Sequence, residues 1–150
     1  MNVLLSVVGM TGSGKSSACD VLRAEGWTSI RFGRLTIDTL IEQGREITPE
    51  NERQVREELR RRHGMGAYAK LLLPRIELAL ERGPVVLDGL YSWSEYKILR
   101  ERYPEAFRVL LIHASPETRY RRLARREERE DDPQATLRRM TAEEARARDY

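Results

Sequence analysis

Short apolar runs alternate with longer amphipathic segments along the chain. Four runs have the length of a strand and are apolar at most positions, which is typical of parallel strands buried on both faces. They are residues 3–8, 27–32, 84–88 and 107–113. Between them, apolar residues recur at helical spacing. The pattern predicts an α/β fold with three layers, in which helices cover both faces of a parallel sheet.

Capping signals mark where several helices begin. Thr48 and Ser115 stand before a proline, and Ser92 opens a capping box with Glu95. The predicted helices cover residues 14–25, 35–43, 49–63, 67–82, 92–103 and 116–130, with a last one from residue 141. No strand-like run follows residue 113, so the sheet has four or five strands. Either the fold is minimal or the chain is truncated before a final strand.

Composition restricts the class of protein. The 150 residues are 40% hydrophobic and 34% charged, and no linker or repeat interrupts them, so we expect one domain over residues 1–150. Cys19 is the only cysteine, which excludes a disulfide scaffold. No apolar run approaches the ~20 residues of a membrane span. Without a recognisable signal peptide, we expect a cytoplasmic protein that has no membrane partner.

The charge pattern is dominated by arginine. The net charge is only +3, which does not favour nucleic-acid binding. The chain has only three lysines, and the remaining 24 of its 27 basic residues are arginines. This bias reflects either codon composition or phosphate handling, for which the guanidinium fork is suited.

The strongest chemical signal follows the first predicted strand. Residues 9–16 read GMTGSGKS and fit the pattern G-x-x-x-x-G-K-[ST]. Its glycines let successive backbone amides point at a phosphate, and the next helix adds its N-terminus. In this pattern Lys15 reaches the β- and γ-phosphates of ATP, and the Ser16 hydroxyl binds Mg²⁺. The predicted nucleotide-binding residues are Gly9, Met10, Thr11, Gly12, Ser13, Gly14, Lys15, Ser16 and Ser17.

An acid ends the third predicted strand. Asp88 follows the apolar residues 85–87, and an acid at this position of a P-loop protein holds Mg²⁺ directly or through water. The alternative is that Asp88 only opens the turn at Gly89. We predict Ser16 and Asp88 as the metal ligands and Asp88 as catalytic, together with Lys15.

The helix after the fourth strand is rich in arginine. Arg119, Arg122 and Arg126 share one helical face, and such a face neutralises charge that develops in phosphoryl transfer. We predict that one or two of these arginines are catalytic. The alternative is a solvated face paired with the acidic residues at 127, 128 and 130. A second set, Arg53, Arg56 and Arg60, either binds an anionic acceptor or lies on a solvated helix, and Tyr91 and Ser92 are candidates for the acceptor pocket.

Four segments, GMTGSGKS, TPENERQVREELR, VLDGLYSWSEY and HASPETRYRRL, together resemble the small archaeal and bacterial P-loop kinases related to adenylate kinase or dephospho-CoA kinase. The resemblance covers nearly the whole chain. It implies the nucleoside monophosphate kinase fold, ATP with Mg²⁺, and a nucleotide-like acceptor. It also implies an acceptor-binding helical insertion at about residues 34–82 and a short lid at about residues 125–135.

The chain departs from that family in two places. The family continues with a final strand and helix beyond residues 148–150. A dephospho-CoA kinase has an acid just after its second strand, whereas this chain has Phe32, Gly33 and Arg34 there, and its nearest acid is Asp38. An arginine in this region suits a phosphate-bearing acceptor.

The leading hypothesis is an ATP-dependent kinase of a small anionic acceptor, of the nucleoside monophosphate or dephospho-CoA type, acting as a monomer or homodimer. The alternative is a regulatory ATP-binding switch that hydrolyses ATP slowly whatever acceptor is present. Its guanine-specific form is disfavoured, because neither Asn2 nor Asn51 begins the Asn-Lys-x-Asp motif. A polynucleotide kinase is disfavoured, since the chain has no aromatic stacking platform.

Overall fold

The computed structural model describes residues 2–125 and 141–149. Arg126 and nearly all of the predicted lid therefore lie outside the described residues. The chain divides into two compact units. Unit 1 consists of residues 1–8 and 16–110, and unit 2 consists of residues 9–15 and 111–150.

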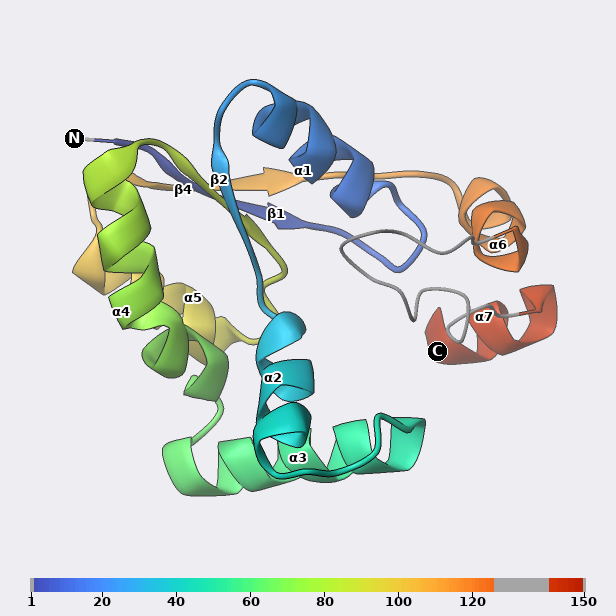
Figure 1. Ribbon diagram of the computed structural model, residues 1–150. Coiled ribbons are helices and arrows are strands. Elements are labelled where there is room, and N and C mark those ends of the chain that lie inside the picture. The colour runs from blue at the N-terminus through green and yellow to red at the C-terminus, as the bar shows by residue number, and fades with distance from the viewer. Residues whose placement is uncertain (1, 126–140, 150) are drawn as a thin grey trace. The chain divides into compact units, whose positions relative to one another are not determined.

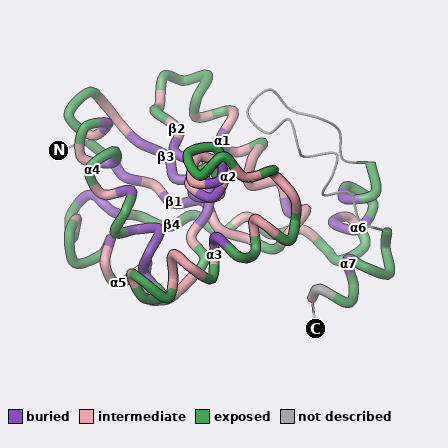
Figure 2. Tube along the Cα trace, turned by 60° about the horizontal axis from the view of Figure 1, so that its bottom comes forward, coloured by how far each residue is buried: buried purple, intermediate pink, exposed green. Residues whose placement is uncertain are grey.

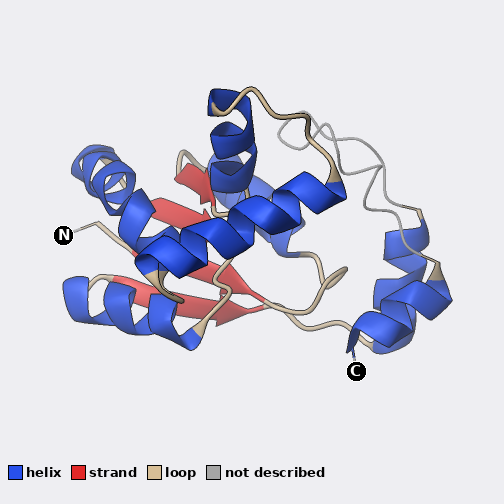
Figure 3. Cartoon of the chain, turned by 90° about the horizontal axis from the view of Figure 1, so that it is seen from below, coloured by secondary structure: helices blue, strands red, loops and turns tan. Residues whose placement is uncertain are grey.

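Unit 1 contains a parallel sheet whose strand order is β2-β3-β1-β4. The strands are β1 (Leu4–Val8), β2 (Thr28–Arg31), β3 (Val85–Asp88) and β4 (Phe107–Leu111). The strands lie side by side in Figure 3, and β3 pairs in parallel with both β1 and β2. The central position of β3 explains its full burial. The predicted parallel sheet is confirmed.

Helices flank the sheet on both faces, as the alternating pattern predicts. In Figure 1, α1 (Lys15–Ala24) lies over one face, and α4 (Ala67–Arg82) and α5 (Trp93–Arg102) cover the other. Between β2 and α4 the chain forms α2 (Arg34–Glu42) and α3 (Pro49–His63). The predicted α/β fold with three layers is therefore confirmed.

The main core lies between the sheet and α4. Strand residues such as Leu4, Ile30 and Leu87 pack there with Tyr68 and Ile76 of α4. In Figure 2 the buried positions mark the central strands β1 and β3, while most of α3 is exposed or only partly buried. Within α3 only Val55 is buried, which explains its very polar sequence.

The predicted helix starts are confirmed by their caps. The Thr48 hydroxyl accepts a hydrogen bond from the Asn51 amide, and the Ser92 hydroxyl accepts one from the Glu95 amide. Ser115 caps the next helix in the same way through the Thr118 amide. Each cap satisfies an N–H group that has no partner inside its helix.

Two predicted ends differ from the structure by more than one residue. The fourth strand ends at Leu111, two residues before the predicted end, because the Ile112 carbonyl instead lies against Gly9. In β4 the residues after Phe107 are exposed, and the described residues place no further strand beside it. The described part of the arginine-rich helix ends at Ala124, although the pattern predicts that it continues to residue 130.

Unit 2 contains α6 (Pro116–Ala124), α7 (Ala142–Asp149) and the glycine-rich segment 9–15. Tyr120, Leu123 and Ala145 form its small core. A buried ion pair between Arg119 and Asp149 also joins the two helices.

Candidate functional site

The glycine-rich segment of unit 2 has a backbone that other residues could not adopt without strain. Gly9, Gly12 and Gly14 have φ values of +156°, +80° and +107°. A Cβ atom on Gly9 would lie 2.3 Å from the Ile112 carbonyl oxygen, and one on Gly12 would lie 2.8 Å from the Arg119 carbonyl oxygen. These close approaches require glycine whether or not the segment binds a ligand.

Polar groups line the inside of this segment. The Lys15 ammonium group donates to the carbonyl oxygens of Gly9 at 2.8 Å and Met10 at 3.2 Å. The Ser13 hydroxyl is buried and has no hydrogen-bond partner among the described residues. A buried hydroxyl that lacks a partner is costly, and a phosphate oxygen would satisfy it. Ser17, in the first turn of α1, is exposed. The residues present therefore fit a phosphate-bearing ligand.

Ser16 and Asp88 meet at the carboxyl end of β3 in unit 1. The Ser16 hydroxyl donates to the Asp88 carboxylate over 3.4 Å, and Asp88 is only 8% exposed. These are the two metal ligands that the sequence predicts. A hydroxyl and a carboxylate are hard oxygen donors, and Mg²⁺ takes few such protein ligands because it keeps waters and binds substrate phosphates. The pair therefore fits Mg²⁺.

Arg31 joins this pair, although the sequence analysis did not select it. Its Nε lies 3.9 Å from Asp88 Oδ2. The parallel register places Arg31 directly opposite Asp88 on the neighbouring strand. The only sign of this contact in the sequence is that an arginine ends β2. That sign becomes informative once the strand order is known.

The two described arginines of the predicted catalytic face of α6 both contact the glycine-rich segment. Arg119 is almost fully buried, forms a bidentate pair with Asp149, and donates to the Thr11 carbonyl over 3.3 Å. Arg122 donates to the Ser13 carbonyl over 2.9 Å. Arg119 is therefore committed to a structural ion pair, whereas the more exposed Arg122 is better placed to meet a phosphate.

The Arg119–Asp149 pair changes the acidity of both groups. Hydrogen bonds from Arg119 and then Tyr120 hold the pKa of Asp149 below its ordinary value. The same hydrogen bond raises the pKa of Arg119. Both side chains therefore stay charged at neutral pH.

The chain matches a known family over nearly its whole length. The family described as "AAA domain" matches residues 6–149. The chain belongs to this family. It is also 35% identical over 134 residues to the UPF0200 protein of Thermococcus gammatolerans. The aligned region covers 88% of this chain and 70% of that protein. The UPF0200 protein of Pyrococcus horikoshii is 34% identical over 133 residues, which is 87% of this chain and 71% of the relative. The chain is therefore a UPF0200 family member as well.

Solved structures support the fold. A gluconokinase from Sinorhizobium meliloti 1021 matches with a TM-score of 0.53 and 21% identity, over 97% of this chain and 71% of that chain. This family member is thus a nucleotide-binding P-loop protein with a kinase-like fold. A specific relation to adenylate kinase or dephospho-CoA kinase stays a prediction.

The predicted acceptor residues Tyr91 and Ser92 lie in the segment that follows Asp88 in unit 1. Their amides both donate to Glu95 Oε2, at 2.7 Å and 3.0 Å. The Tyr91 ring packs against Phe32 and Tyr68, with ring centroids 6.2 and 6.3 Å away. A Cβ atom on Gly89 would lie 2.8 Å from the Tyr91 hydroxyl oxygen. The Tyr91 side chain therefore lies next to the turn directly after Asp88.

The three predicted arginines of α3 differ in their surroundings. Arg53 is exposed and pairs with Glu57, which favours the solvated-helix interpretation for this residue. Arg56 pairs with Glu52. Arg60 is partly buried, and its charge lowers the pKa values of Tyr68 and Glu95 against the larger rise that burial causes. Arg34, after β2, forms an exposed pair with Asp38.

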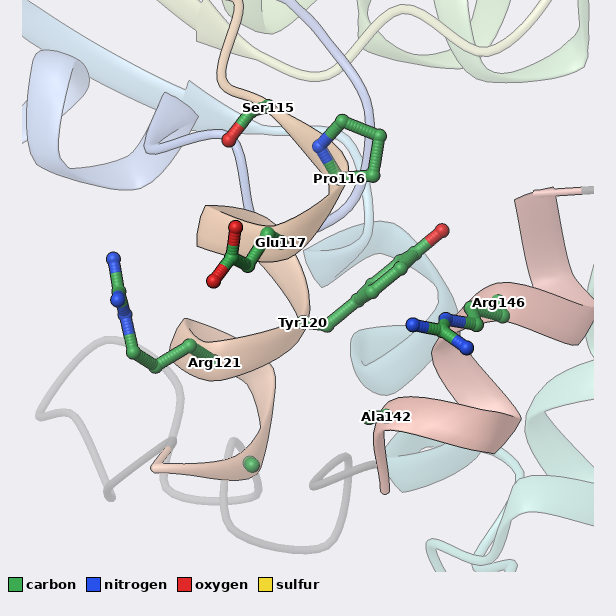
Figure 4. A pocket seen from close by; sticks show the side chains of 8 residues that line it. Ser115, Pro116, Glu117, Tyr120, Arg121, Ala142 and Arg146 are labelled. Atoms are coloured by element: carbon green, nitrogen blue, oxygen red, sulfur yellow. The ribbon is translucent and has the colours of Figure 1, made fainter.

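A separate cavity of about 690 Å³ lies between α6 and α7 in unit 2 (Figure 4). Figure 4 shows Tyr120 and Arg146 directed toward each other, and the Arg146 guanidinium lies 5.8 Å from the centre of the Tyr120 ring. The cavity uses the face of α6 that carries Glu117, Tyr120 and Arg121. Helical spacing puts this face opposite the one that contacts the glycine-rich segment, so the cavity is not placed to receive the phosphates.

Two further features are absent from residues 2–125 and 141–149. No helix there is long and apolar enough to cross a membrane. No group of three or more histidine, cysteine or acidic side chains could hold a metal within that part of the chain.

Proposed function

We propose that this protein binds Mg·ATP through residues 9–17 and transfers the γ-phosphoryl group to a small anionic, nucleotide-like acceptor. The observation that carries the proposal is the contact of Ser16 with the buried Asp88 carboxylate. In the motif Ser16 directly follows Lys15 along the chain. We therefore propose that the Ser16 hydroxyl, the Lys15 ammonium group and the Asp88 carboxylate act on one nucleotide.

Each residue has a distinct part in the proposed reaction. Lys15 withdraws its ammonium group from the Gly9 and Met10 carbonyl oxygens to meet the phosphates. Ser16 and Asp88 hold Mg²⁺, which when bound neutralises charge on the β- and γ-phosphates. Arg122 adds positive charge beside the glycine-rich segment. The acceptor oxygen bonds to the γ-phosphorus, the bond between the γ-phosphorus and the bridging oxygen breaks, and ADP leaves. A hydroxyl acceptor gives up its proton to water, whereas an ionised phosphate acceptor has no proton to lose.

Basic residues of unit 1 support an anionic acceptor. Arg31 lies beside Asp88, and Arg34 begins the next helix. Among the described residues Arg34 pairs with Asp38 near the surface, so an acceptor phosphate could compete for it. We propose residues 34–82 as the acceptor-binding part and residues 125–135 as a lid, within one kinase domain.

The test is a coupled ADP-release assay with Mg·ATP and a panel of acceptors: nucleoside monophosphates, dephospho-CoA, gluconate and a DNA 5′-hydroxyl end. Lys15→Ala is the test variant. Lys97→Ala is its matched control, since this lysine is exposed on α5 in unit 1, outside residues 34–82. Acceptor-dependent release that is lost only in Lys15→Ala supports a kinase. Equal, slow release with every acceptor supports the regulatory switch instead and contradicts the proposal.

A further inference from the structure

Arg31 and Ser16 contact the same oxygen atom of Asp88. The Arg31 Nε atom lies 3.9 Å from Asp88 Oδ2, and the Ser16 hydroxyl donates to that oxygen over 3.4 Å. The proposed reaction uses Asp88 to hold Mg²⁺, so the arginine contacts the carboxylate that the metal needs. Any change in the charge of Asp88 therefore changes how strongly Arg31 is attracted to it.

The strand register explains why these side chains meet. Ile30 and Leu87 are paired one step earlier in the register, and both belong to the core that includes α4. Successive side chains of a strand point to opposite faces of the sheet, so Arg31 and Asp88 point away from α4. In Figure 1 the other face is the one that α1 covers, and Ser16 lies in the first turn of α1. The backbone pairing thus fixes the position of Arg31 beside Asp88.

The Arg31 side chain is accessible to a ligand. It is 22% exposed, twice the 11% of the Asp88 side chain. It ends β2 at the carboxyl edge of the sheet, and ligands of open parallel sheets bind outside this edge. The 3.9 Å contact is longer than a hydrogen bond, so charge attraction rather than fixed geometry joins the pair. An anion that can form hydrogen bonds with the guanidinium group therefore competes with Asp88.

We propose that Arg31 exchanges Asp88 for the anionic group of the acceptor, so that the acceptor binds tightly only after the Asp88 carboxylate has been neutralised. While Asp88 is an uncompensated anion, it attracts Arg31 and repels an approaching phosphate or carboxylate. Once Asp88 holds Mg²⁺, both effects weaken. The inference rests on the proposed kinase function and adds an order to it, in which Mg·ATP binding prepares the acceptor site. By linkage, the acceptor tightens Mg·ATP binding by the same factor.

The competing explanation is that Arg31 is a permanent structural partner of Asp88. It predicts that substitution of Arg31 lowers stability, while the charge of Asp88 has the same effect on anion binding with or without Arg31. A double-mutant cycle of Asp88→Asn and Arg31→Gln separates the two explanations. Arg31→Lys keeps the charge and is the conservative variant. Arg100→Gln is the matched control, since Arg100 is exposed on α5 and donates to the Pro104 carbonyl.

The experiment measures binding of inorganic phosphate, a probe for the anionic group, to the 150-residue chain by calorimetry. The non-hydrolysable analogue AMPPNP is present at saturation with EDTA, and thermal unfolding of each variant is recorded alongside. We expect Asp88→Asn to bind phosphate at least tenfold more tightly than the wild type. Arg31→Gln should reduce this gain to less than twofold, whereas Arg31→Lys retains most of it and Arg100→Gln all of it.

The metal provides a second arm that needs no substitution of Asp88. With Mg²⁺ in place of EDTA, we expect the wild type to bind phosphate at least fivefold more tightly and Arg31→Gln to show no such gain. This arm decides the inference if Asp88→Asn fails to fold. Equal gains with and without Arg31 overturn the inference, as does the absence of phosphate binding in every variant. Phosphate that displaces AMPPNP binds at residues 9–17 instead and overturns it as well.

The outcomes separate this inference from the proposed function. A gain in phosphate affinity that needs Arg31, without release of ADP in the presence of any acceptor, upholds the exchange at Arg31 and overturns the kinase. Release of ADP with the same KM for the acceptor in the wild type and in Arg31→Gln does the reverse.

Discussion

Two side chains among the described residues contact the Asp88 carboxylate in different ways. The Ser16 hydroxyl donates to it, while the Arg31 guanidinium attracts it from 3.9 Å. Asp88 is only 8% exposed, and a magnesium ion would interact with its carboxylate more strongly than either contact does. If Asp88 holds Mg²⁺ as proposed, its substitution should affect activity more than folding.

Replacing Asp88 by asparagine tests this directly. Asn removes the charge but keeps an oxygen for Ser16, so we expect kcat to fall about 100-fold or more while ATP still binds in the absence of Mg²⁺. Steady-state kinetics and binding in EDTA measure the two effects. Asp20→Asn, which alters an exposed ion pair with Arg23 on α1, is the control and should retain activity. An Asp88→Asn variant as active as Asp20→Asn would remove Asp88 from the site.

Gly12 provides a second residue-level prediction, because another glycine serves as a control. Gly12 and Gly44 have similar φ values of +80° and +65°. A Cβ atom on Gly12 would meet the Arg119 carbonyl at 2.8 Å, whereas one on Gly44 has nothing within 4 Å. We expect both alanine variants to lose about 1–2 kcal/mol of stability from the backbone, measured by urea unfolding. Only Gly12→Ala should also lose ATP binding, and equal ATP affinity in the two variants would contradict a tight phosphate-binding segment.

Several of these residues could be predicted from the sequence and others could not. The motif selects residues 9–17, and the acid at the end of an apolar run selects Asp88, because both signals are local. Arg31 becomes part of the site only through strand pairing. The sequence identifies Glu95 only as a capping residue. It does not reveal that the second carboxylate oxygen is buried, because that burial depends on packing between helices far apart in the chain.

At the scale of elements, two opposite faces of α6 make different contacts. One contacts the glycine-rich segment through Arg119 and Arg122, and the other lines the cavity through Tyr120 and Arg121. Helical periodicity predicts which arginines share a face. It does not reveal that Asp149, 30 residues after Arg119, takes up that guanidinium, because this pairing depends on how α7 packs.

The Asp149 carboxylate predicts a pH dependence for the packing of α6 on α7. Its pKa is lowered, so between that value and the ordinary one near 4 the unfolded form binds more protons than the folded form. The stabilisation is therefore complete above about pH 5 and is lost as the pH falls through the lowered pKa. We expect Asp149→Asn to speed amide exchange in residues 116–124 at neutral pH, with the difference from wild type shrinking at acid pH.

Asp20→Asn is the control for that measurement, because Asp20 pairs with Arg23 on the surface of α1 in the other unit. It should leave exchange in residues 116–124 unchanged. A difference between Asp149→Asn and wild type that stays constant from pH 7 down to pH 3 would mean that the charge of Asp149 does not hold the helices together.

At the scale of the whole molecule, the family match spans both units. The "AAA domain" family covers residues 6–149, which includes the glycine-rich segment of unit 2 and the Ser16, Asp88 and Glu95 positions of unit 1. The alternation of strands and helices predicts the parallel sheet, because that pattern repeats along the chain. The order β2-β3-β1-β4 is not encoded in any local pattern, and it decides which strand ends meet.

Ligand linkage provides the prediction for the complete chain. A ligand that binds only the folded state at 100 times its Kd adds about 2.7 kcal/mol of stability. For a chain of this size, that corresponds to a rise in Tm of roughly 5–10 °C. We expect Mg·ATP to produce this rise in scanning calorimetry of the wild type and of Lys97→Ala, and little or none in Lys15→Ala. Because Lys15 is proposed to act on the phosphates, adenosine should shift none of the three, and a rise with Mg·ATP that persists in Lys15→Ala would place ATP away from residues 9–17.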